Sequence, residues 1–346
     1  MSGRPARRLS GPYAPPVPVR ELTVTSADGA RLYAQAHGPD GAPAVVLAHG
    51  WTCSTAFWAP VVHRLAEDHR VIVYDQRGHG RSPAARPGGC GTGALADDLV
   101  AVLETTLADG ERAVLAGHSM GGMALMAAAD RPRVRAHAAA ALLCSTGSSA
   151  LIARAEVLPL PAGRVRTLLT RTLLGSRAPL GPVTPFAKAV LRYATMGRGA
   201  APVMIEAGAR IVHACPRRVR ADWGAVLAEL DLDAGVANMT MPTAVLQGTV
   251  DRLTPIGHAR RIAARLPECV GLTELHGLGH MTPLEDPVAV ADRIRELVTA
   301  YVTARPAGPA GEPGDGLTDG PTDGSTDRPT DAPADASNDD AKERTA

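Results

Sequence analysis

The chain has 346 residues, of which 45% are hydrophobic, 21% charged and 3% aromatic, and its formal net charge is +1 at neutral pH. This composition is ordinary for a globular protein, and the length suffices for one large domain. The near-neutral charge and the scarcity of aromatic residues argue against a nucleic-acid-binding protein, which usually carries a basic stripe with interleaved aromatic side chains.

The cysteines and the lengths of the apolar runs indicate in which cellular compartment the protein is expected. The five cysteines are scattered and odd in number, so they predict neither a disulfide framework nor a zinc site. Free thiols are typical of a reducing compartment, and we expect a cytoplasmic protein. The Arg- and Pro-rich start lacks the apolar region of a signal peptide. Because no run approaches the roughly 18 apolar residues of a membrane-spanning helix, we expect no membrane span.

Both ends of the chain have compositions typical of disorder. Residues 1–20 are rich in Arg and Pro, and residues 304–346 consist mainly of Pro, Gly, Thr, Asp and Ala. Such segments have few apolar side chains to bury and cannot offset the entropy cost of ordering. We therefore predict a disordered N-terminus and a disordered acidic tail, in which residues 305–346 carry a net charge of −6.

Between these ends, apolar runs alternate with helical patterns. Residues 21–25 and 32–36 predict a hairpin that turns at residues 26–29. Further strands are expected at 44–48, 71–74, 113–116, 138–143, 243–247 and 272–275. Helices are expected at 57–67, 93–107, 122–129, 256–265 and 287–303. Strands that alternate with helices favour an α/β protein with a mostly parallel sheet covered on both faces.

One region breaks this alternation, since no strand is predicted in residues 148–237. It contains helical segments separated by Gly and Pro, at 151–158, 164–174, 186–195, 202–214 and 219–230. We predict that residues 148–237 form a helical cap inserted into a core of residues 21–147 and 238–303. Apolar cap side chains either line a pocket or form the core between the cap helices: Leu158, Leu160, Leu168, Leu169, Leu173, Leu174 and Met204.

A Gly-x-Ser-x-Gly pattern spans residues 117–121, between a predicted strand and a predicted helix. At such a junction the pattern is typical of a nucleophile elbow, a sharp and strained turn that exposes a serine hydroxyl above the sheet. The glycines two residues before and after Ser119 keep other side chains away from the turn. Since the pattern by itself also fits an ordinary Gly-rich turn, the rest of the chain has to supply a base and an acid.

Polar residues follow other strands at their carboxyl ends, where open α/β sheets bind ligands. Residues 49–52 follow the strand at 44–48, and residues 75–82 follow the strand at 71–74. Asp251 lies shortly after the strand at 243–247, and His280 lies shortly after the strand at 272–275. The chain order Ser, Asp, His is the one found in α/β-hydrolases and differs from other serine triads.

Taken together, the motifs resemble those of the α/β-hydrolase family, in its branch of serine esterases and cofactor-free haloperoxidases. The resemblance covers roughly residues 21–303 and rests on HGW, DQRGHGRS, GHSMGG, GTVDRLTP and GLGHMTPLEDP, in the family's order. It implies an α/β-hydrolase fold, with a mostly parallel central sheet, helices on both faces and a helical cap inserted before the acid-bearing strand.

The resemblance also implies a role for each of five residues. Ser119 would be the nucleophile, and His280 would accept its proton and later return it to the leaving group. Asp251 would orient the imidazole and stabilise its charged form. The backbone N–H groups of Trp51 and Met120 would form the oxyanion hole.

Other residues compete for these roles. His276 lies before the glycine-rich loop, where family residues are usually structural, so His280 is preferred as the base. Residues 144–147, where some relatives place the acid, contain no carboxylate, which favours Asp251. The Trp51 ring is expected either in the pocket or in the core. The remaining candidates are expected to be structural or to support loops: Asp75, Asp286, His49, His79 and Cys53.

A serine at the elbow excludes the chemistry of haloalkane dehalogenases and epoxide hydrolases, which use aspartate there. We predict a serine hydrolase that cleaves a carboxylic ester, thioester or lactone through an acyl-enzyme, with a small-molecule acyl substrate and neither cofactor nor metal. Three alternatives stay open: a cofactor-free haloperoxidase or perhydrolase, a carbon–carbon bond hydrolase, and a ligand-binding receptor that keeps the fold.

Overall fold

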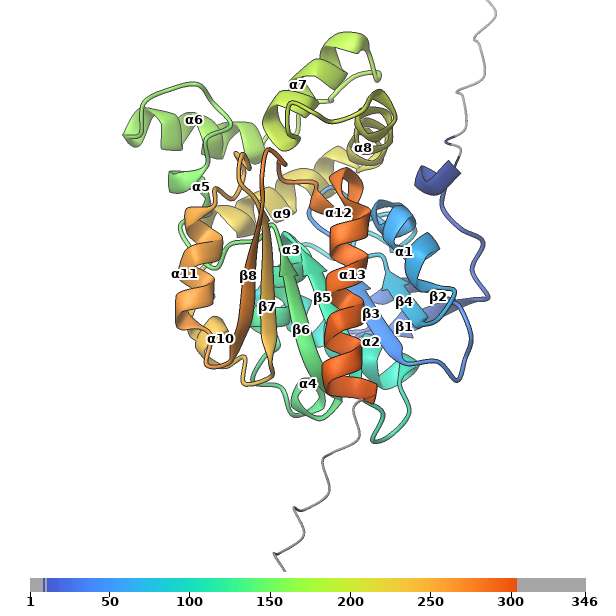
Figure 1. The fold of residues 1–346 in the computed structure, drawn as a ribbon. Coiled ribbons are helices and arrows are strands. Elements are labelled where there is room, and N and C mark those ends of the chain that lie inside the picture. The colour runs from blue at the N-terminus through green and yellow to red at the C-terminus, as the bar shows by residue number, and fades with distance from the viewer. Residues whose placement is uncertain (1–8, 10, 304–346) are drawn as a thin grey trace, which may run out of the picture. The chain divides into compact units, whose positions relative to one another are not determined.

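The computed structural model describes residues 9 and 11–303 (Figure 1), so the predicted acidic tail and most of the first ten residues lie outside it. Eight strands form one sheet in the order β1-β2-β4-β3-β5-β6-β7-β8. Their bounds are β1 Arg20–Thr25, β2 Arg31–His37, β3 Ala44–Ala48, β4 Arg70–Tyr74, β5 Ala113–His118, β6 Ala138–Cys144, β7 Thr243–Gly248 and β8 Cys269–Leu275. β1 and β2 form the predicted antiparallel hairpin, β2 also pairs antiparallel with β4, and the other pairs are parallel.

Helices cover both faces of the sheet, as predicted (Figure 1). Those of the core are α1 Ala59–Leu65, α2 Thr92–Thr106, α3 Met120–Ala127, α4 Pro132–His137, α11 Gly257–Arg265, α12 Thr282–Glu285 and α13 Pro287–Val298. Alternate residues of one strand enter opposite cores, because successive side chains of a strand point to opposite faces. Val45 and Leu47 of β3 pack with α1 and α13, whereas Val46 packs with α2 and α3.

The helices between β6 and β7 form a cap (Figure 1). They are α5 Leu151–Arg154, α6 Arg164–Leu174, α7 Pro185–Thr195, α8 Pro202–Ala214, α9 Arg217–Glu229 and α10 Asp233–Ala237. α5 is shorter than the predicted helix at 151–158, since the chain turns away to donate the Glu156 N–H to the Arg252 carbonyl at 2.7 Å. The predicted helix at 287–303 is α13 followed by a π-helical turn, Thr299–Thr303.

Most of the apolar cap side chains do not form a core between the cap helices. Four of the seven are exposed: Leu160, Leu168, Leu169 and Leu173. Leu158, Leu174 and Met204 are half-buried. In α6 the buried position is occupied by Thr170, so Leu168, Leu169 and Leu173 point outward.

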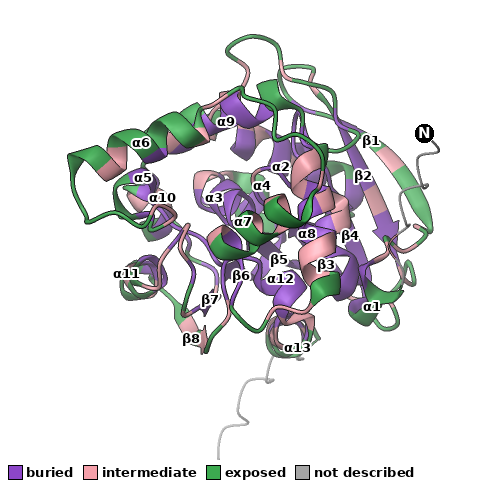
Figure 2. Ribbon diagram, turned by 90° about the horizontal axis from the view of Figure 1, so that it is seen from above, coloured by how far each residue is buried: buried purple, intermediate pink, exposed green. Residues whose placement is uncertain are grey.

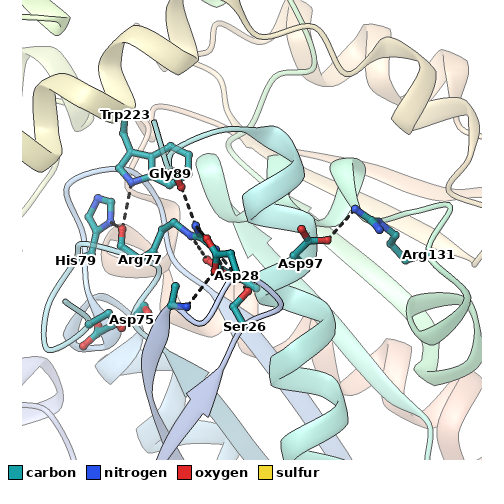
Figure 3. Close-up of polar contacts among 12 residues, drawn as sticks. Ser26, Asp28, Asp75, Arg77, His79, Gly89, Asp97, Arg131 and Trp223 are labelled. Atoms are coloured by element: carbon teal, nitrogen blue, oxygen red, sulfur yellow. Dashed lines mark hydrogen bonds and ion pairs between the residues drawn. The ribbon is translucent and has the colours of Figure 1, made fainter. Parts of the chain in front are cut away.

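Arg77, in the loop after β4, ties that loop to the rest of the core, and its contacts with Asp28, Gly89 and Trp223 can be followed in Figure 3. Arg77 is 1% exposed, and its guanidinium donates to both carboxylate oxygens of Asp98 on α2, at 2.7 and 2.5 Å. It also donates to Asp28 in the β1–β2 turn and to the Gly89 carbonyl. The Trp223 indole of α9 donates to the Arg77 carbonyl at 3.1 Å, so the same residue joins the core to the cap.

Replacing Asp98 with alanine is expected to lower the free energy of unfolding by about 3–5 kcal/mol, because the buried Arg77 guanidinium loses its one buried carboxylate partner and keeps only the half-exposed Asp28. Chemical denaturation of the purified protein measures this loss. The neighbouring Asp97 gives a matched control, since its ion pair with Arg131 lies at the surface. Asp97→Ala should cost no more than about 1 kcal/mol. Equal losses in the two variants would contradict the importance of the buried pair.

Candidate active site

Ser119 lies in the turn between β5 and α3, with backbone angles of φ 52° and ψ −117°. Positive φ is rare for residues with a side chain and signals a strained conformation maintained by its surroundings. The turn is held on one side by the Ser119 N–H, which donates to the Cys144 carbonyl at 2.9 Å. On the other side, the Thr146 hydroxyl donates to the Ser119 carbonyl at 2.8 Å. The strained turn expected of the Gly-x-Ser-x-Gly pattern is therefore present.

Two glycines make this turn possible. A Cβ atom on Gly117 would lie 2.5 Å from the backbone of Gly121, and one on Gly121 would lie 2.0 Å from the Ala48 carbonyl oxygen. Both distances are far below van der Waals contact, so any larger residue would push α3 away from the ends of β3 and β5. The pattern thus reflects the close approach of three backbone segments.

Asp251 and His280 meet at the ends of β7 and β8, as predicted from their positions in the chain. The His280 Nδ1–H donates to Asp251 Oδ2 at 2.7 Å, and both side chains are buried. The Asp251 carboxylate also accepts hydrogen bonds from the Gln247 amide, the Thr254 hydroxyl and the backbone N–H groups of Leu253 and Thr254. These donors hold the carboxylate in one orientation, which in turn orients the imidazole. His276, the competing base, is exposed.

The hydroxyl of Ser119 has no hydrogen-bond partner in the structure that is described, and so makes no hydrogen bond to His280. Such contacts are often long in free enzymes and tighten when substrate binds. The N–H groups of Trp51 and Met120 likewise have no acceptor within the described part of the chain. Met120 is the first residue of α3, where backbone donors lack a partner in the helix.

The loop that contains Trp51 packs directly against the elbow. A Cβ atom on Gly50 would lie 3.1 Å from Ser119 Cβ and 2.8 Å from His118 Nδ1. The Trp51 ring is half-buried, and its indole N–H donates to the Arg220 carbonyl of α9 at 3.0 Å. The ring therefore joins this loop to the cap.

The catalytic role of each predicted residue stays a prediction.

His49 and His79 are hydrogen-bonded supports, as expected. The His49 Nδ1–H donates to the Gly50 carbonyl while its Nε2 accepts the Gln76 N–H. His79 is arranged in the same way, and its Nε2 accepts the Thr52 N–H at 3.2 Å. Burial lowers the pKa of His49 to about 3 and that of His79 to about 4. Bases this weak are poorly suited to accept a serine proton near neutral pH.

Three further expectations for structural residues are confirmed. Asp75 accepts the backbone N–H groups of Thr55 and Arg81 and so orients two loops. Asp286 caps α13 by accepting the Ala289 N–H at 3.0 Å. Cys53 is a small buried residue, and burial raises the pKa of its thiol.

His118 supports His280, a role that was not predicted from the sequence. Its Nε2–H donates to the His280 backbone carbonyl at 2.8 Å, and the two ring centroids lie 4.9 Å apart. Burial holds the pKa of His118 well below its usual value, so the ring stays neutral. The residue before Ser119 therefore fixes the backbone position of His280.

The end of α7 braces the loop that contains His280. The Thr195 carbonyl accepts the N–H groups of His280 and Met281, at 2.8 and 3.2 Å. The buried Glu285 carboxylate accepts the N–H groups of Gly279, at 3.1 Å, and of Gly197, at 2.7 Å. Burial raises the pKa of this carboxyl despite these donors. The cap thus holds the histidine loop through two sets of hydrogen bonds.

Glu285→Gln is expected to lower kcat for ester hydrolysis about 10- to 100-fold, because a displacement near 1 Å in an active site can cost that much. Glutamine keeps one acceptor but presents an amide NH₂ where the second backbone N–H needs an acceptor. Steady-state kinetics should show KM changing much less than kcat. The exposed Glu296 on α13 provides the control, and Glu296→Gln should retain full activity. A wild-type kcat in Glu285→Gln would show that the Glu285 hydrogen bonds are not needed to position the His280 loop.

Two other properties of the described residues concern metal ions and membranes. No group of three or more His, Cys, Asp or Glu side chains in residues 9 and 11–303 is arranged to hold a metal ion. In the same residues, no helix is long and apolar enough to cross a membrane.

Comparison with known proteins identifies similar sequences and structures. A profile described as "Alpha/beta hydrolase family" matches residues 45–293. A protein of Variovorax paradoxus named "Putative carbamate hydrolase RutD" is 34% identical over 255 residues, which cover 72% of this chain and 88% of the relative. The bifunctional esterase/perhydrolase DCH of Acinetobacter calcoaceticus is 40% identical over 100 residues, 29% of this chain and 35% of the relative. A thermophilic esterase from Thermogutta terrifontis aligns with a TM-score of 0.65 and 24% identity, over 82% of this chain and 99% of that one.

Proposed function

The chain belongs to the alpha/beta hydrolase family, and on that premise we propose that it is a serine hydrolase that cleaves a small carboxylic ester, thioester or lactone. The observation that carries the proposal is the position of Ser119, whose φ of 52° presents its hydroxyl at the start of α3. His280, paired with Asp251 at 2.7 Å, supplies the base that this hydroxyl needs.

The proposed reaction has two halves. In the first, Ser119 Oγ attacks the substrate carbonyl carbon while His280 Nε2 accepts its proton, and the same proton then passes to the leaving alcohol or thiol. In the second, water attacks the acyl-enzyme and Ser119 is regenerated. The negative charge on the tetrahedral oxygen is stabilised by the Trp51 and Met120 N–H groups, each of which contributes roughly 3 kcal/mol.

Two neighbouring activities have a specific observation in their favour. The identity to the RutD relative, which extends over most of its length, supports carbamate cleavage, in which Ser119 attacks a carbonyl flanked by nitrogen. The shorter match to an esterase/perhydrolase supports peracid formation, in which hydrogen peroxide replaces water in the second half. All three activities pass through a covalent Ser119 ester and differ either in the acyl or carbamoyl group that it carries or in the acceptor that releases it.

The proposal also covers the domain organisation of the chain and its location in the cell. Residues 21–147 and 238–303 form the hydrolase core in this proposal, and residues 148–237 form the cap over it. The five cysteines are all free thiols, which supports the expected cytoplasmic location.

The test is covalent labelling of the full chain with a fluorophosphonate, followed by intact-mass analysis and peptide mapping. We expect one adduct on Ser119 and loss of p-nitrophenyl acetate hydrolysis in proportion to labelling. Parallel assays with an aryl carbamate and with hydrogen peroxide as acceptor rank the three activities. A folded protein that forms no adduct and turns over none of these substrates would support a ligand receptor instead.

A further inference from the structure

Helix α6 presents its apolar side to solvent. Val165, Leu168, Leu169 and Leu173 are 69%, 64%, 45% and 50% exposed, whereas Thr170 is the buried residue of the helix. Residues three, four and eight positions apart lie on one face of a helix, so these four side chains form one continuous stripe. A surface helix normally turns such a stripe toward the core. The reversed orientation of α6 is therefore a feature that folding alone does not explain.

Helix α7 repeats this arrangement. Phe186, Val190 and Tyr193 are 79%, 50% and 43% exposed and are spaced four and three residues apart, again on one face. Figure 1 shows α6 and α7 at the top of the cap, and Figure 2, seen from above, shows both helices largely exposed. We refer to these seven side chains as the α6–α7 apolar face. Exposed apolar patches of this kind mark interaction sites.

Cationic side chains flank the α6–α7 apolar face, and three of them pair with carboxylates of α8 and α9: Arg171 with Glu229, Arg177 with Asp222 and Lys188 with Glu206. Residues 157–205 contain seven Arg and Lys residues and neither Asp nor Glu. On α6, Arg164 and Arg171 lie on one flank of the stripe and Arg166 lies on the other, since each residue turns the helix by about 100°. Within the described chain, no carboxylate pairs with Arg164, Arg166 or Arg198. An apolar stripe flanked by arginines is the pattern of a helix that lies in a membrane interface.

The possible occupants of this face differ in what they offer. The acidic tail, residues 305–346, matches its charge but has a single large apolar residue, Leu317, and cannot cover seven such side chains. A second copy of the chain would offer apolar side chains but would bring arginines against arginines. An anionic lipid surface offers both an apolar layer and negative charge, and attracts each nearby Arg or Lys. Charge complementarity therefore favours the lipid surface.

We propose that the α6–α7 apolar face is a docking surface for anionic membranes. Phe186 and the exposed leucines of α6 enter the headgroup–acyl boundary, while Arg164, which is exposed and pairs with no carboxylate in the described chain, keeps its guanidinium group at the phosphates. The attachment is peripheral and reversible, and it places the cap, not the opposite end of the sheet, against the membrane. Binding depends on the cap surface and not on hydrolysis.

Vesicle co-sedimentation of the full chain tests the proposal. We expect binding to phosphatidylglycerol-containing vesicles, little binding to pure phosphatidylcholine vesicles, and weaker binding as salt increases. Leu168→Ser combined with Phe186→Ser should reduce the partition coefficient at least about tenfold, since both side chains supply buried apolar area. Arg164→Gln should reduce it about fivefold. The control is Val19→Ser combined with Val288→Ser, which alters two exposed valines outside the cap and should bind as wild type.

Several results would overturn the proposal. One is equal binding by wild type and the Leu168/Phe186 double variant, and another is no binding to anionic vesicles at low salt. Light scattering adds a third: a dimer that the double variant dissociates, without vesicle binding, would assign the face to a second copy. Binding that appears only after residues 305–346 are deleted would assign it to the tail.

Discussion

Replacing Ser119 with alanine is expected to lower kcat for ester hydrolysis on the order of 10⁶-fold, to the background of the assay. The side chain makes no hydrogen bond within the described residues, so its removal leaves no buried group without a partner. The elbow backbone is held by Cys144 and Thr146 and by the close approach of glycines, none of which the substitution alters. Stability should therefore stay within about 0.5 kcal/mol of wild type.

Two assays measure the loss of activity in Ser119→Ala: steady-state kinetics with p-nitrophenyl acetate, and covalent labelling with a fluorophosphonate. Ser119→Ala should neither turn over the ester nor form the adduct, while thermal unfolding is unchanged. Ser176→Ala, on the cap, is the matched control and should behave as wild type in both assays. Retention of more than a few per cent of the activity by Ser119→Ala would mean that another group is the nucleophile.

Asp251→Asn is expected to lower kcat about 10⁴-fold while KM changes little, because the imidazole then adopts the wrong tautomer. In the wild type, Asp251 Oδ1 accepts two backbone N–H groups and Oδ2 accepts the His280 Nδ1–H. Asparagine keeps its oxygen toward the backbone donors and turns its NH₂ toward His280. The ring must then accept at Nδ1 and carry its proton on Nε2, where it can no longer receive the proton of Ser119.

The Asp251 prediction has an internal control in Asp75, another buried aspartate at a strand end. The hydrogen bonds of Asp75 come from loop backbone N–H groups, so Asp75→Asn should cost stability but keep kcat within about tenfold of wild type. Fluorophosphonate labelling should slow in Asp251→Asn in parallel with kcat, because labelling also needs the base. Equal kinetics of the two variants would remove Asp251 from the proposed mechanism.

Much of the fold could be predicted from local sequence patterns. The alternation of apolar runs and helical segments corresponds to a sheet covered on both faces, and the region without strands corresponds to the cap. The elbow is also local, since Gly117 and Gly121 are needed where backbone segments lie within contact distance of each other. Errors concentrate at element ends such as α5, where a contact with Arg252, distant in sequence, ends the helix early.

The supports of the candidate site could not be predicted in this way. His118 contacts the His280 carbonyl across 162 residues, and Glu285 contacts Gly197 across 88. Glu285 stands within a recognised motif, yet nothing in the motif indicates that its carboxylate binds the cap. Such pairs depend on how loops from different elements converge, which no periodicity encodes.

The sequence by itself determined the order of the elements, the serine at the elbow, and the aspartate and histidine that follow at later strand ends. These depend on residue type and short spacing, which act through local backbone geometry. Only the tertiary structure decided that the cap braces His280 and that α6 turns its leucines outward. The apolar stripe of α6 is the same in sequence whether it faces the core or solvent, and packing against the neighbouring helices selects one of the two orientations.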